Sequence, residues 1–146
     1  MSLLKRLFGS NFEPKTINVP GIGTMSNDKH GQWHGVMRIS FLDKELDLTI
    51  NTEEVSDVEL ELINRIEENF EKIHQQLKQD LFEDIEDFPD GTTMEQVFES
   101  LSFDFIHIRN PTERKWGLSA TSEFDDNHIF DILFTDLELE TFLMDG

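Results

Sequence analysis

The sequence lacks cysteine and tyrosine, and only 12 of its 146 residues are lysine or arginine. Without cysteine there can be no disulfide, no thiolate metal ligand and no thiol nucleophile. The few cations stand against 31 aspartates and glutamates, so the formal net charge is −19. Binding to nucleic acid or to an anionic membrane needs cations that neutralise phosphate groups. We therefore expect neither a nucleic-acid partner nor a membrane partner.

Long hydrophobic runs are also missing. No stretch approaches the roughly 20 apolar residues of a membrane-spanning helix, and residues 1–8 have Lys5 and Arg6 inside their apolar stretch, unlike a secretory signal. The sequence thus favours a cytoplasmic protein. Isoleucine, leucine, valine and phenylalanine make up 46 of the 146 residues, enough for a hydrophobic core. We expect one domain over residues 1–146, with residues 1–15 as a loose N-terminal segment.

Alternation of apolar and polar residues predicts strands with one buried face. The expected strands cover residues 16–19, 33–41, 45–51, 103–109, 116–124, 129–134 and 138–143. The residues Asp125, Asp126 and Asn127 are typical of a hairpin turn between two of these strands.

The helical part of the sequence begins with a capping box of Ser56 and Glu59. Apolar residues at helical spacing follow in one stripe, formed by Val58, Leu62, Ile66, Phe70, Ile73, Leu77 and Leu81. This stripe predicts one long helix over about residues 57–85, and a second capping box at Thr93 predicts a short helix over about residues 94–101. The predicted fold class is α+β, a mainly antiparallel sheet with both helices packed on one face.

Oxygen and nitrogen ligands crowd around the expected turn, where Asp125, Asp126 and His128 lie close in sequence. Three interpretations are open: a capped turn, a metal or partner contact, or acid–base chemistry by an Asp–His pair. The spacing does not match a calcium-binding EF-hand loop, and no phosphate-binding loop or nucleophile motif is present. His30 and His34 do not share a helix face, so their spacing does not indicate a metal site. We assign no catalytic residue, no metal ligand and no cofactor.

The negative charge is concentrated in the second half of the chain. Residues 116–146 contain eight acids and no lysine or arginine, and residues 80–90 contain six acids. These acids are expected to form a surface that binds a basic protein partner. The expected contacts are Glu83, Asp84, Asp87, Asp125, Asp126 and His128, with Trp116 as an anchor if it is exposed.

The C-terminal segment also resembles a family of small acidic bacterial domains of unknown function. The resemblance is carried by a strand that begins at Trp116, a D-x-x-H motif at Asp125–His128 and a return strand with Phe134 and Asp136. Ile129 stands where that family usually has glycine. Some of those domains are similar to immunity proteins of toxin systems, which implies a cytosolic inhibitor of a toxin. The alternatives are a metal-dependent module or enzyme centred on Asp125, Asp126 and His128, or a homodimeric accessory protein.

Overall fold

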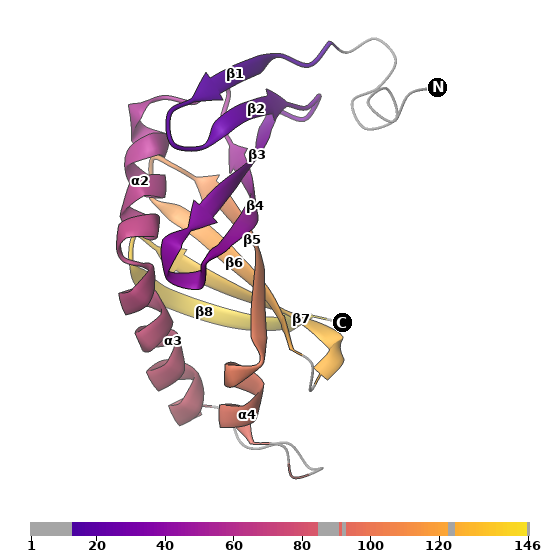
Figure 1. Cartoon of the computed structure of the whole chain (residues 1–146), viewed down its shortest axis with the longest axis vertical. Coiled ribbons are helices and arrows are strands. Elements are labelled where there is room, and N and C mark those ends of the chain that lie inside the picture. The colour runs from indigo at the N-terminus through magenta and orange to yellow at the C-terminus, as the bar shows by residue number, and fades with distance from the viewer. Residues whose placement is uncertain (1–12, 85–90, 92, 123–124, 146) are drawn as a thin grey trace.

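Eight strands form one sheet, in which each strand lies beside its neighbour in sequence from β1 to β8 (Figure 1). The computed structural model describes residues 13–84, 91, 93–122 and 125–145. The strands are β1 (Thr16–Val19), β2 (Gly23–Asn27), β3 (Gln32–Ile39), β4 (Lys44–Asn51), β5 (Leu101–Asn110), β6 (Lys115–Ser122), β7 (Asp125–Thr135) and β8 (Glu138–Asp145). A short 3-10 helix, η1 (Ser40–Leu42), connects β3 to β4.

The sheet is mixed, because β4 and β5 run parallel whereas the other neighbouring strands are antiparallel. Parallel neighbours need a crossover connection. Three helices supply it: α2 (Asp57–Glu68), α3 (Phe70–Asp84) and α4 (Met94–Glu99). The predicted fold class was therefore wrong in two respects: the eight-stranded mixed sheet dominates the molecule, and the long helix expected over residues 57–85 is two shorter helices.

Asn69 separates these two helices. Its backbone leaves the helical region at φ −111° and ψ 13°. Its side-chain Nδ2 donates to the carbonyl oxygen of Arg65 at 2.8 Å, the same oxygen that accepts from the Asn69 backbone N–H. Asparagine favours helix ends because its amide competes for backbone partners in this way. The apolar stripe continues across the break, so periodicity alone did not reveal it.

The hydrophobic core lies between the helices and one face of the sheet. Helices α2 and α3 run along one side of the sheet in Figure 1. The buried helical residues are Leu62, Ile63, Ile66, Phe70, Ile73 and Leu77, and they form one cluster with the buried strand residues. On β3 and β4 the side chains of Trp33, Met37, Leu46, Leu48 and Ile50 are buried at alternate positions. Val58, expected in the stripe, is instead 51% exposed.

Two further expectations differ from the structure. Strand β2 was not predicted, and it lies within a stretch rich in glycine and asparagine. The residues Asp125, Asp126 and Asn127, expected in a turn, belong to the beginning of β7, where Asp125 is the partner of Ser122 on β6. The expected loose N-terminal segment falls mostly on residues outside the described part of the chain.

Candidate partner-binding surface

Trp116 was expected to anchor a partner only if its side chain were exposed, but the structure buries it with 0% exposure. Its ring stacks on Phe134, with ring centroids 4.3 Å apart. Its indole Nε1 donates to the backbone carbonyl of Asp136 at 2.6 Å. Trp116 thus contacts two other residues of the C-terminal motif from within the core.

The predicted acidic contacts fall on two separate elements. Glu83 and Asp84 lie at the end of α3, and Asp125, Asp126 and His128 lie in the first half of β7. Asp87 lies outside the described residues. The structure therefore assigns these residues to the end of a helix and to a strand next to the sheet edge, respectively.

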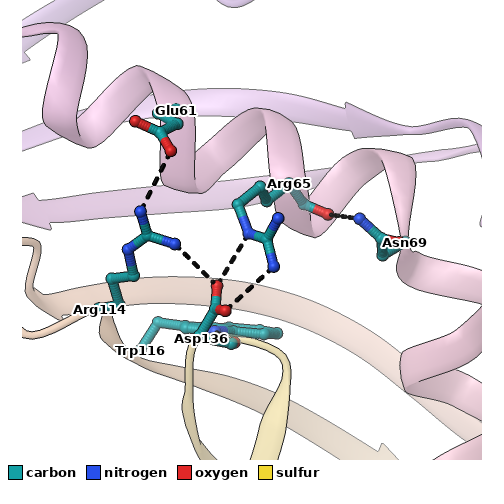
Figure 2. A network of polar contacts seen from close by, with 6 residues as sticks. All are labelled: Glu61, Arg65, Asn69, Arg114, Trp116 and Asp136. Atoms are coloured by element: carbon teal, nitrogen blue, oxygen red, sulfur yellow. Dashed lines mark hydrogen bonds and ion pairs between the residues drawn. The ribbon is translucent and has the colours of Figure 1, made fainter.

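A polar network that the sequence did not predict joins α2 to the turn between β7 and β8 (Figure 2). The Asp136 carboxylate accepts hydrogen bonds from Arg65 Nε at 2.9 Å and from Arg65 Nη2 at 3.0 Å, which form a bidentate ion pair. Arg114 reaches Asp136 at 3.5 Å and Glu61 at 3.1 Å. The backbone N–H of Asp136 also donates to the carbonyl of Arg114 at 2.7 Å. The turn is thereby tied to both the helix and the start of β6.

The charges in this network shift the pKa of two of its members. The hydrogen bond from Arg65 lowers the pKa of the Asp136 carboxyl, partial burial opposes this, and the positive charges of Arg65 and Arg114 add to the lowering. The same hydrogen bond and charge raise the pKa of the Arg65 guanidinium. Both groups are therefore charged at neutral pH, and the negative charge of Asp136 is balanced by the adjacent arginines.

Three more described cations are held in ion pairs within the chain. These pairs are Arg38 with Asp43, Lys44 with Asp104 at 3.2 Å, and Lys115 with Glu113 at 3.8 Å. At the C-terminal edge of the sheet, by contrast, the acids have no cation beside them in sequence. Glu138 and Glu140 on β8 are exposed, and no lysine or arginine occurs after Lys115.

Hydrogen-bonded polar side chains lie on the face of the sheet opposite to the helices. His34 Nε2 lies 2.6 Å from Asp28 Oδ2, and His34 Nδ1 lies 3.5 Å from the Thr49 hydroxyl. Thr49 is 5% exposed, which leaves little room for a substrate beside its hydroxyl. Among the side chains that the structure describes, no three His, Asp or Glu residues come together as a metal site would require.

Comparison with known proteins leaves the family resemblance as a prediction from the sequence. No protein-family model, no curated protein and no solved structure matches this chain. No helix among the described residues is both long and apolar enough to cross a membrane. Fold and surface together define a mixed-sheet protein whose C-terminal strands carry exposed acids.

Proposed function

We propose that this protein is a cytoplasmic, non-catalytic binding protein whose acidic surface captures a basic protein partner, in the manner of an immunity protein that inhibits a toxin. One observation carries the proposal: five described cations (Arg38, Lys44, Arg65, Arg114 and Lys115) are paired with acids of the same chain, while Glu138 and Glu140 are exposed on the edge strand β8, which contains no lysine or arginine. The negative field at that edge is therefore available to a partner.

Such a field acts first on the rate of encounter. Electrostatic steering raises association rates by roughly 10- to 1,000-fold at low salt, and the gain falls steeply as salt rises. Complementary charge also disfavours acidic competitors. If the partner is a nuclease, the acidic surface would occupy the cationic groove that binds phosphates, which would inhibit the enzyme directly.

The test uses the products of the neighbouring genes, purified separately. We expect one basic product to bind, with an association rate by stopped-flow fluorescence that falls at least tenfold between 50 and 500 mM NaCl. Expression of that product alone should slow cell growth, and co-expression of this protein should restore it. The proposal fails if no basic product binds, or if the association rate does not change with salt.

A further inference from the structure

The two edges of the sheet differ in how they are protected. Strand β1 has four residues, and Pro14 and Pro20 flank it. Strand β8 has eight residues and contains neither proline nor lysine. Proline lacks an N–H group and lysine resists edge pairing, so both are common protections of sheet edges. Strand β8 has one irregularity, a bulge at Glu140 between the residues paired with Phe134 and Leu133. On either side of this bulge the long edge keeps backbone groups that another strand could bond.

The side chains of β8 are also accessible. Glu138, Glu140 and Thr141 are exposed, and Leu143 is 52% exposed. Leu143 is the cross-strand partner of Asp131 on β7, which places it on the same face as Ile129, 51% exposed. The edge thus offers backbone groups, two carboxylates and a small apolar patch within one strand and its neighbour.

The charge of this edge selects its occupant. A second copy paired antiparallel over the whole of β8 would place Glu138 of each copy opposite the acid Asp145 of the other, and like charges on neighbouring strands are destabilising. An extended segment with lysine or arginine at alternate positions would place cations beside Glu138 and Glu140. We propose that β8 docks such a cationic, extended segment of the basic partner as a ninth strand, by strand addition. This inference rests on the proposed function and names the surface and the form of the partner.

The experiment uses a fluorescent eight-residue peptide of alternating lysine and valine and measures its affinity for the full chain by anisotropy. A second peptide has the same side chains but methyl groups on alternate backbone nitrogens, which removes donors for strand pairing and keeps the charge. We expect the methylated peptide to bind at least tenfold more weakly.

Two matched variants locate the binding. The variant Glu138→Lys/Glu140→Lys changes the edge, and Glu68→Lys/Glu99→Lys makes the same change in net charge at exposed positions near the ends of α2 and α4. We expect at least a tenfold loss of affinity from the edge variant and less than a threefold loss from the helix variant. Circular dichroism checks that both variants are folded.

Four results would overturn docking at β8. Equal binding of both peptides, or equal losses from both variants, would show capture by charge without strand addition and leave the proposed function intact. No peptide binding up to 1 mM would also overturn it, whereas the partner test above would still decide the proposed function. A concentration-dependent dimer in sedimentation that the edge variant alone abolishes would make a second copy the occupant.

Discussion

Substitution of Asp136 tests whether the turn between β7 and β8 depends on one carboxylate. Asp136 makes the paired hydrogen bonds to Arg65 and also adopts a left-handed backbone, with φ at 52°. Three variants separate these two contributions. Asp136→Asn removes the charge but tolerates the backbone, Asp136→Gly removes the side chain and relieves the backbone, and Asp136→Ala removes the side chain and keeps the strain.

The magnitudes follow from exposure and backbone geometry. The side chains of Asp136 and Arg65 are 33% and 38% exposed, so solvent screens their attraction and loss of the pair should cost about 1 kcal/mol. Alanine in a left-handed conformation costs roughly 1–2 kcal/mol more. Glycine avoids that strain but loses about 0.5–1 kcal/mol through the greater freedom of the unfolded chain. The expected order of stability is wild type, Asn, Gly and then Ala.

Urea unfolding followed by tryptophan fluorescence measures these differences, because Trp116 bonds directly to the Asp136 carbonyl. The lowered pKa of Asp136 adds a dependence on pH. A carboxyl group whose pKa is lower in the folded state stabilises the protein above its unfolded pKa of about 4, and this contribution disappears as the pH falls through the folded value. The difference between wild type and Asp136→Asn should therefore shrink below about pH 4.

Two results would refute this reasoning. If Asp136→Asn is as stable as wild type at pH 7, the paired hydrogen bonds contribute nothing net to the fold. If Asp136→Gly is less stable than Asp136→Ala, the positive φ at this position does not strain a residue with a Cβ. Far-UV circular dichroism of each variant confirms that the native state is retained before the comparison is made.

Two further predictions concern the sheet. The pKa of His107 is lowered by burial and by the positive charges of Arg109 and His34. The unfolded chain therefore takes up a proton at higher pH than the folded protein does, and the free energy of unfolding should fall as the pH drops from 7 to 5. Urea unfolding of His107→Gln should show a smaller fall, and the same pH dependence as in the wild type would contradict this. A Cβ on Gly35 would lie 2.9 Å from Met25 Cγ, so Gly35→Ala should cost about 1–3 kcal/mol in thermal unfolding. In a Met25→Ala background the same change should cost under about 0.5 kcal/mol, and an equal cost in both backgrounds would rule out this contact as the cause.

The strands and their buried faces were largely predictable because alternation is a local signal. Strand β1 has the predicted bounds, and α2 begins directly after the capping residue Ser56 as expected. The break at Asn69 was missed because the apolar stripe continues across it. Strand β2 was missed because its turn depends on positive φ angles at Gly21 and Gly23, and glycines near a short strand resemble a loop.

The polar network around Asp136 could not be predicted from the sequence for a different reason. Arg65 and Asp136 are 71 residues apart in the sequence, and only the packing of α2 against the turn after β7 brings them together. The C-terminal motif includes Asp136, two residues after Phe134. The sequence alone does not show whether such an acid stabilises the fold or binds a partner. Trp116 illustrates the same ambiguity, since an aromatic residue at the start of a strand can face the core or a partner.

The acids at the C-terminal edge differ in what holds them. Asp131 accepts a hydrogen bond from the Ser119 hydroxyl at 2.9 Å, and Asp136 is held by two arginines; both are only partly exposed. Glu138 lies two residues beyond Asp136 but is exposed on the edge strand. Acids that stabilise the fold and an exposed acid thus occur within one hairpin. Since surface substitutions away from such contacts usually change stability little, replacement of Glu138 can remove charge from the edge without loosening the hairpin that presents it.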